Sequence, residues 1–197
     1  MARDTLIIFL RQPALGRVKR RLAGVIGAAA ARGVYLALMR RTIARLAGAP
    51  RWRTVLAVTP DRADWRGWPR RLPRVGQGGG DLGRRMARAL RRLARPRAVL
   101  IGSDIPAVDR PAIARAFAAL GRSRFVLGPA EDGGYWLIGW RRGAWPAGAL
   151  GRVRWSTRHA LADSRAGLPP GRAVARVDRL ADLDDADAYR AWRATAR

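Results

Sequence analysis

Short apolar runs alternate with helical patterns along this chain, and that alternation restricts the possible folds more than any other feature. The runs TLIIF at residues 5–9 and AVLIG at residues 98–102 are rich in β-branched and aliphatic residues, which predicts buried strands. Residues 28–47 repeat apolar side chains at helical spacing. Strands that alternate with helices predict a largely parallel sheet with helices on both faces. In such sheets the ligand site lies beyond the carboxyl ends of the strands.

The same patterns predict the remaining elements. We expect further strands at 54–58, 125–128, 135–140 and 173–177, and helices at 82–93, 111–120, 157–166 and 185–196. Residues 61–74, rich in Trp, Arg and Pro, predict an irregular segment. The chain of 197 residues is long enough for one domain with a sizeable core.

Composition narrows the function classes. The chain has no cysteine, which excludes disulfides and thiolate metal sites, and its apolar runs are too short for a signal peptide or a membrane span. We therefore expect a cytoplasmic protein. The net charge of +26 is compatible with a nucleic-acid partner, but the arginines are scattered and no recognition module is visible. We expect no specific nucleic-acid function.

A basic loop follows the first predicted strand. Gly16 allows a close backbone turn, while Arg11, Lys19 and Arg20 supply positive charge that can cradle phosphates. The spacing is not that of a Walker motif. Lys19 is the only lysine among 40 basic residues, so this position either needs a compact ammonium or has kept its lysine by chance.

Acidic residues follow two later segments. Asp104 comes directly after the strand at 98–102, where a carboxylate can bind a metal–phosphate group or merely cap the next helix. The segment LADLDDADAY contains Asp182, Asp184 and Asp185, which can cap the last helix or complete a metal site.

The turn EDGG presents two adjacent carboxylates, Glu131 and Asp132, or is an ordinary hairpin turn. Other candidates are weaker. His159 is the only histidine, which excludes a multi-histidine metal site, and Ser156 lacks the surroundings of a hydrolase nucleophile.

The order of the motifs is more specific than any one of them. The chain carries P-x-x-G-x-x-K-x-R-L, QGGGDLG, GSDIP, GPAEDGGYWLIG and WST in succession. On these motifs it resembles the family of domain of unknown function 2064, an arsenosugar-biosynthesis glycosyltransferase-like family related to phospholactate guanylyltransferase. The resemblance extends over residues 6–189. It implies a single-domain α/β fold of glycosyltransferase-A type, also called the nucleotide-diphospho-sugar transferase fold, over residues 1–197.

The resemblance also implies site residues. A divalent metal, Mg²⁺ or Mn²⁺, would be held by Asp104 and Asp184, although Asp185-Ala186 and Ala188-Tyr189 depart from the family pattern and leave Asp182 as an alternative second ligand. Arg20 is a further departure, at a position where the family has a small hydroxyl residue. The residues expected to bind nucleotide or phosphate are Arg11, Gly16, Arg17, Lys19, Arg21, Gly80 and Asp81. Those expected around an acceptor are Gly133, Gly134, Tyr135, Trp155, Ser156 and Thr157.

The function implied is that of a metal-dependent transferase with a nucleotide-activated donor. Glu131 or Asp132 would orient or deprotonate the acceptor. We expect a glycosyltransferase that uses a nucleotide sugar and a small-molecule acceptor. A nucleotidyltransferase that uses a nucleoside triphosphate is the alternative, and a non-catalytic nucleotide-binding module is a third interpretation. The sugar, the base, the acceptor and the oligomeric state stay open.

Overall fold

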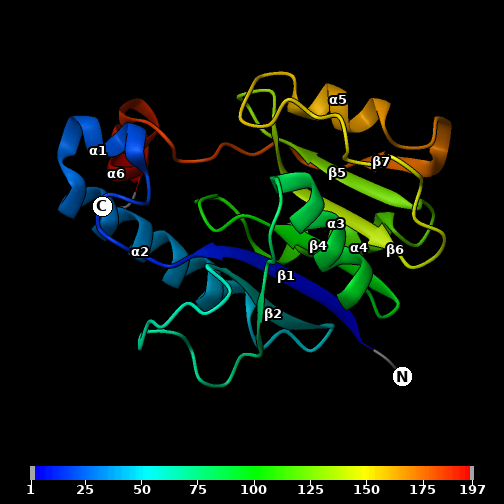
Figure 1. The fold of residues 1–197 in the computed structure, drawn as a ribbon, viewed down its shortest axis with the longest axis horizontal. Coiled ribbons are helices and arrows are strands. Elements are labelled where there is room, and N and C mark those ends of the chain that lie inside the picture. Colours follow the sequence, from blue (N-terminus) through cyan, green and yellow to red (C-terminus); the bar gives the residue numbers. More distant parts are fainter. Residues whose placement is uncertain (1–2, 196–197) are drawn as a thin grey trace.

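A seven-stranded sheet forms the centre of the computed structural model, which describes residues 3–195 (Figure 1). Its strands lie in the order β3-β2-β1-β4-β6-β5-β7, and only β6 runs antiparallel to its neighbours. The strands are β1 (Asp4–Arg11), β2 (Trp52–Thr59), β3 (Arg74–Gly76), β4 (Arg97–Ile101), β5 (Phe125–Pro129), β6 (Tyr135–Arg141) and β7 (Val174–Arg176). The prediction of a mostly parallel sheet is confirmed.

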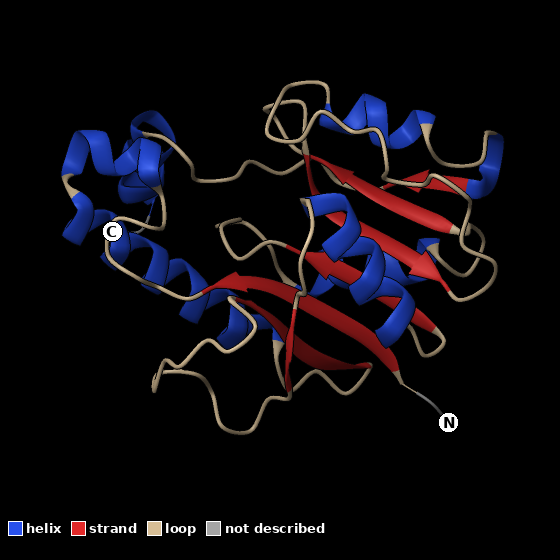
Figure 2. Cartoon of the chain, viewed as in Figure 1, coloured by secondary structure: helices blue, strands red, loops and turns tan. Residues whose placement is uncertain are grey.

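Helices cover both faces of this sheet (Figure 2). Side chains alternate along β1, so Leu6 and Ile8 pack with α2 and α4, whereas Ile7 packs with α3 on the opposite face. The helices are α1 (Arg20–Ile26), α2 (Ala28–Leu46), α3 (Leu82–Leu93), α4 (Arg110–Ala119), α5 (Ala160–Ala166) and α6 (Ala186–Thr195), with a 3₁₀ turn at Gly171–Ala173. The predicted layers are therefore confirmed.

A smaller cluster lies beside the sheet, where α1, α2 and α6 meet. Its buried side chains include Leu22, Leu38 and Leu183. The segment after β7 crosses from the sheet to this cluster before α6 begins (Figure 1). The cluster thus brings the C-terminal acidic segment back to the basic loop near the N-terminus.

Four local features differ from the sequence prediction. Helix α1 occupies part of the expected loop; it has seven residues, includes Gly24 and lacks a side-chain cap, so its pattern is weak. Strand β3 is a three-residue strand that we did not predict. Helix α5 begins at Ala160 rather than at 157, because residues 157–159 form a turn in which the N–H of Ala160 donates to the carbonyl of Thr157 (3.1 Å). Helix α6 begins at Ala186 rather than at 185, because Asp185 caps it by accepting a hydrogen bond from the N–H of Ala188; residue 196 of the expected helix lies outside the described residues.

The N-terminus of α4 gives a prediction about stability. The side chain of Asp109 accepts a hydrogen bond of 2.8 Å from the backbone N–H of Ala112. We expect Asp109→Ala to lower the free energy of unfolding by about 1 kcal/mol, because the first turn loses its cap. Urea denaturation checks this, and an unchanged midpoint would show that the cap contributes nothing.

Candidate functional site

The carboxyl ends of β1, β4 and β5 meet at one edge of the sheet, because these strands run in the same direction. The loops that follow them carry Lys19, Asp104 and Asp132 respectively. A fourth segment joins this edge from the C-terminal part of the chain, since the backbone N–H of Leu183 donates a hydrogen bond of 2.9 Å to the carbonyl of Asp104. That bond places Asp184 next to Asp104.

The ammonium of Lys19 lies between two carboxylates. Its Nζ is 2.8 Å from Oδ2 of Asp104 and 2.5 Å from Oδ1 of Asp184. These partners are 85 and 165 residues away along the chain. The Lys19 side chain is only 3% exposed, while both carboxylates are partly exposed. The ammonium therefore joins three distant segments at the edge of the sheet.

The backbone and the charge state of Lys19 both reflect this position. Lys19 precedes α1 with φ 48° and ψ 50°, a left-handed conformation that is strained for a residue with a side chain. Burial alone lowers the pKa of Lys19, but the carboxylates of Asp104 and Asp184 more than offset burial, so the pKa lies above its ordinary value. The lysine is charged at neutral pH.

The sequence left open whether Asp104 and Asp184 cap helices, and the structure shows that other aspartates close to them do so. Asp109 caps α4, and Oδ1 of Asp185 accepts a hydrogen bond of 2.9 Å from the N–H of Ala188 at the start of α6. Asp104 and Asp184 instead face Lys19. The alternative that Asp104 caps the next helix is therefore wrong.

The two carboxylates around Lys19 form a donor set that fits a divalent cation. A cation, the lysine ammonium, already lies between Asp104 and Asp184. Within residues 3–195 no group of three or more acidic, histidine or cysteine side chains is arranged to hold a metal ion. Two carboxylates are the number that Mg²⁺ commonly takes from a protein when phosphate oxygens and waters complete its coordination. Asp104 and Asp184 are thus the residues that would hold a metal.

A large cavity opens on one side of the Lys19 ion pairs. Its volume is about 680 Å³, and we call it the basic cavity. The basic side chains that line it are Arg11, Arg17, Lys19, Arg20, Arg21 and Arg85, and its acidic ones are Asp104, Asp132 and Asp184. The excess of positive charge suits an anion with several negative charges, such as a nucleotide phosphate chain.

Several residues that line the basic cavity were not predicted as site residues, and three of them, Tyr35, Gln77 and Arg85, make hydrogen bonds that shape it. The hydroxyl of Tyr35 accepts from the N–H of Arg11 (2.9 Å) and donates to its carbonyl (2.8 Å), which fixes the end of β1. The Gln77 amide donates to the carbonyls of Leu10 and Ala57, and its oxygen accepts from Arg85. Gln77 is the first residue of the motif QGGGDLG, so the sequence motif could have indicated that it belongs to the site. No sequence pattern distinguishes Arg85 from the many other arginines.

Arg85 has an unused donor. Its Nε–H is buried and has no hydrogen-bond partner in the part of the chain that the structure describes. Burial, and then the charge of Arg11, lowers the pKa of the Arg85 guanidinium. A buried donor beside a second arginine points to an anion that would satisfy it.

A smaller cavity adjoins the basic cavity on the side of β6 and α5. Its volume is about 190 Å³, and we call it the acidic pocket. Among its lining residues are the carboxylates of Asp104, Asp132 and Asp182 and the rings of Tyr135 and Trp155. Burial, and then the charges of Asp184, Asp132 and Asp104, raises the pKa of Asp182 to about 6. The charged side chains among the described lining residues are therefore all acidic, in contrast to the net positive charge of the whole chain.

The two cavities share five lining residues, which are Leu82, Gly102, Asp104, Asp132 and Ser156. Asp132 belongs to the turn between β5 and β6, and its Oδ1 accepts a hydrogen bond of 2.8 Å from the N–H of Gly134, which holds the carboxylate in place. Gly133 has φ 84°, and a Cβ there would lie 2.3 Å from the carbonyl oxygen of Arg158. The turn thus requires glycine for its conformation and for its contact with residue 158.

The cavities contain only part of the predicted site. From the acceptor set, Gly134, Tyr135, Trp155, Ser156 and Thr157 line the acidic pocket. Gly16, Gly80, Asp81, Glu131 and Gly133 are not among the residues that line either cavity. Asp81 caps α3 through a hydrogen bond of 2.8 Å from the N–H of Arg84. Both Glu131 and Asp132 are exposed, but only Asp132 lines the cavities, so the geometry favours Asp132 over Glu131 as the carboxylate near a ligand.

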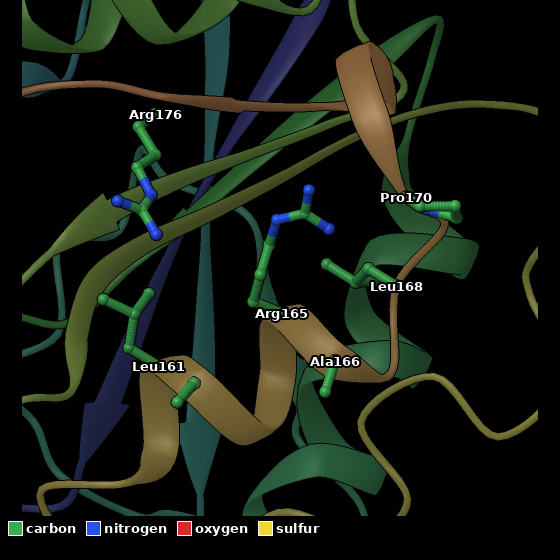
Figure 3. Close-up of a pocket in the computed structure, with 7 residues that line it drawn as sticks. Leu161, Arg165, Ala166, Leu168, Pro170 and Arg176 are labelled. Atoms are coloured by element: carbon green, nitrogen blue, oxygen red, sulfur yellow. The ribbon is translucent and has the colours of Figure 1, made fainter.

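A third hollow, of about 540 Å³, lies between α5 and β7 (Figure 3). Arg165 and Arg176 extend toward it from these two elements, and Leu161 and Leu168 form apolar parts of its lining. Its described lining shares no residue with the basic cavity or the acidic pocket and contains no carboxylate. Among the described linings of these three cavities, carboxylates occur only at the basic cavity and the acidic pocket.

Structural comparison supports the predicted fold. A crystal structure of a candidate nucleotide-diphospho-sugar transferase from Desulfovibrio desulfuricans G20 superimposes with a TM-score of 0.82 at 27% identity, over 94% of this chain and 84% of that one. A 4-diphosphocytidyl-2C-methyl-D-erythritol synthase from Anaerococcus prevotii DSM 20548 superimposes with a TM-score of 0.59 at 9% identity, over 98% of each chain, and at that identity shows the fold alone. The predicted nucleotide-diphospho-sugar transferase fold is confirmed, and the predicted enzyme class agrees with the neighbour from Desulfovibrio desulfuricans G20.

Sequence comparison identifies the family. No curated protein matches the chain. No helix within residues 3–195 has the length and apolar character needed to cross a membrane. The family model described as "Uncharacterized protein conserved in bacteria (DUF2064)" matches residues 42–157, more than half of the chain, including QGGGDLG, GSDIP, EDGGY and WST. The basic loop and Asp184 lie outside the matched range, but the core motifs lie within it, and the chain belongs to the DUF2064 family.

Proposed function

We propose that this protein is a metal-dependent transferase that takes a glycosyl group from a nucleotide sugar and passes it to a small-molecule acceptor. The observation that carries the proposal is the position of Lys19, Asp104 and Asp184 where a basic cavity meets an acidic pocket. The nucleotide-diphospho-sugar transferase fold supports a nucleotide-activated donor.

The donor diphosphate would occupy the basic cavity. Arg11, Arg17 and Arg85 offer charged donors, and the free Nε–H of Arg85 would gain a partner. Lys19 has three N–H donors, of which Asp104 and Asp184 use two. The third is available for a phosphate oxygen.

The departing diphosphate needs stabilisation as its bond to the sugar breaks. A metal held by Asp104 and Asp184 would supply Lewis-acid stabilisation of the phosphate oxygens when bound. Lys19 and the arginines of the basic cavity neutralise the same developing charge, and preorganised charges of this kind are often the largest contribution to catalysis.

The acceptor would enter from the acidic pocket. Its hydroxyl oxygen forms a bond to the anomeric carbon, the bond between that carbon and the diphosphate oxygen breaks with its electron pair, and Asp132 takes the hydroxyl proton. Asp132 suits this role because it lines both cavities and is held by the N–H of Gly134. The products are a glycosylated acceptor, a nucleoside diphosphate and a proton.

One observation favours a second function, nucleotidyl transfer from a nucleoside triphosphate. The basic cavity has six basic side chains against three carboxylates, which suits a triphosphate as well as a diphosphate. In that reaction an acceptor oxygen bonds to the α-phosphorus and pyrophosphate leaves. We favour the glycosyl reaction because the solved structure at 27% identity is described as a candidate nucleotide-diphospho-sugar transferase.

The released product separates these two reactions. We expect the protein, supplied with Mn²⁺, a small-molecule extract and a panel of nucleotide sugars, to release nucleoside diphosphate. With nucleoside triphosphates in place of nucleotide sugars we expect no pyrophosphate above the level of an Asp104→Asn control. Pyrophosphate release that depends on Asp104 would replace the glycosyl proposal with the nucleotidyl one.

A second prediction concerns Asp104. We expect Asp104→Asn to abolish the increase in nucleotide affinity that Mn²⁺ produces, because one of two carboxylate ligands is lost. Calorimetric titration with and without Mn²⁺ measures this increase. Asp109→Asn is the matched control on the same loop, and it should retain the full effect. An unchanged increase in Asp104→Asn would remove Asp104 from the metal site.

A third prediction concerns the competition between Lys19 and the metal. A dication bound between Asp104 and Asp184 must displace the ammonium that lies there. We therefore expect Lys19→Met to bind Mn²⁺ in the absence of nucleotide on the order of tenfold more tightly than the unaltered protein, because a competing charge is removed. The same variant should bind nucleotide more weakly, because a phosphate contact is lost.

Electron paramagnetic resonance of free Mn²⁺ measures the metal affinity directly. Lys19→Arg keeps the positive charge and serves as the control, with Mn²⁺ affinity expected to stay low. Equal Mn²⁺ affinity in Lys19→Met and the unaltered protein would show that the ammonium does not occupy the metal position.

A further inference from the structure

The acidic pocket lacks basic side chains in a chain that is otherwise rich in them. The chain has 40 basic residues, and six of them line the adjoining basic cavity. Among the described residues that line the acidic pocket there is no arginine or lysine, but there are three carboxylates. Of these, Asp182 lines only the acidic pocket, whereas Asp104 and Asp132 also line the basic cavity.

This contrast in charge suggests what the pocket can bind. We propose that the acidic pocket takes the acceptor, an uncharged or cationic polyol or amino alcohol, and excludes phosphorylated and carboxylated compounds. The name acceptor rests on the function proposed above, whereas the charge preference rests on the lining of the pocket alone.

Charge supports the exclusion. An anionic group in the pocket would face Asp132 and Asp182 with no described basic side chain on the lining to pair with it. A metal at Asp104 and Asp184 would neutralise those two carboxylates but would leave Asp132 and Asp182. Like charges at short range in a partly buried site repel strongly. A hydroxyl or an ammonium donates hydrogen bonds to the same carboxylates.

Size and shape support a small ligand. The volume of about 190 Å³ equals the share of liquid volume of roughly six water molecules, which suits a small molecule or one terminal group. The rings of Tyr135 and Trp155 meet edge to face, with centroids 6.3 Å apart, and both line the pocket together with Met86. Such walls contact the C–H groups of a polyol while the carboxylates contact its hydroxyls.

Four three-carbon compounds of similar size test this preference without donor or metal. They are glycerol, 3-amino-1,2-propanediol, glycerate and glycerol 3-phosphate, titrated at constant ionic strength. The readout is the chemical shift of the Trp155 indole N–H, which is assigned by its loss in Trp155→Phe. Inorganic phosphate serves as a reference for anion binding in the adjoining basic cavity.

We expect the neutral and amino compounds to shift the Trp155 resonance in a saturable way. Glycerate and glycerol 3-phosphate should produce no shift beyond that of inorganic phosphate. Asp182→Asn should raise the affinity for the two anionic compounds by about tenfold, because one repelling charge is removed. Asp187→Asn, which removes an exposed charge on α6 outside both cavities, should change nothing.

Three results would overturn the proposal. One is binding of the anionic compounds as tight as that of glycerol in the unaltered protein. Another is an equal response in Asp182→Asn and Asp187→Asn. The third is the absence of a Trp155 shift with every compound, which would mean that the pocket binds no such ligand. Donor turnover plays no part in this experiment, so a failure of the proposed function and a failure of the charge preference are seen separately.

Discussion

The contact of Lys19 with Asp104 and Asp184 is the interaction on which the site depends. It joins a loop near the N-terminus, a loop after a central strand and the segment before the last helix. Without the ammonium, two carboxylates would face each other at the edge of the sheet, and their repulsion would favour separation of the C-terminal segment from β4. The hydrogen bond from Leu183 to Asp104 and the burial of Leu183 between α1, α2 and α6 support the same geometry. One buried charge and one small apolar cluster therefore assemble three distant parts of the chain.

The distribution of charge around this contact makes the two sides of the site chemically different. A protein with a net charge of +26 attracts anions over much of its surface, so attraction alone does not select a site. Selection would come from two adjacent cavities with different charged linings: six basic side chains line the cavity on one side of Asp104, and no described basic side chain lines the pocket on the other. A polyanionic donor and a neutral or cationic acceptor would each be stabilised on one side only. The same sheet edge would thus orient two substrates by charge.

The sequence predicts the sheet well, for a physical reason. Strands such as β1 and β4 are buried on both faces, so they are continuous apolar runs, and the residue after each run marks the carboxyl edge. The role of Lys19 in pairing two carboxylates could not be predicted, because its partners are 85 and 165 residues away and no local pattern records that separation. Helix α1 was not predicted because its local pattern is weak: its seven residues lack both a side-chain cap and a long apolar period. Arg85 is one of many arginines, and only the fold distinguishes it from the rest.

The choice of lysine at position 19 follows from the geometry of its partners. Two carboxylate oxygens from different segments lie 2.8 Å and 2.5 Å from a single nitrogen. An ammonium directs three donors outward from one point, so it can contact both carboxylates and keep a third donor for a phosphate. A guanidinium is planar and directs paired donors toward one carboxylate, and its larger group would separate Asp104 from Asp184. The flexible stem also allows the ammonium to move away when a metal takes its place, while a bidentate arginine would hold one carboxylate more firmly. A chain that uses arginine at its other 39 basic positions therefore has a structural reason to keep lysine at this one.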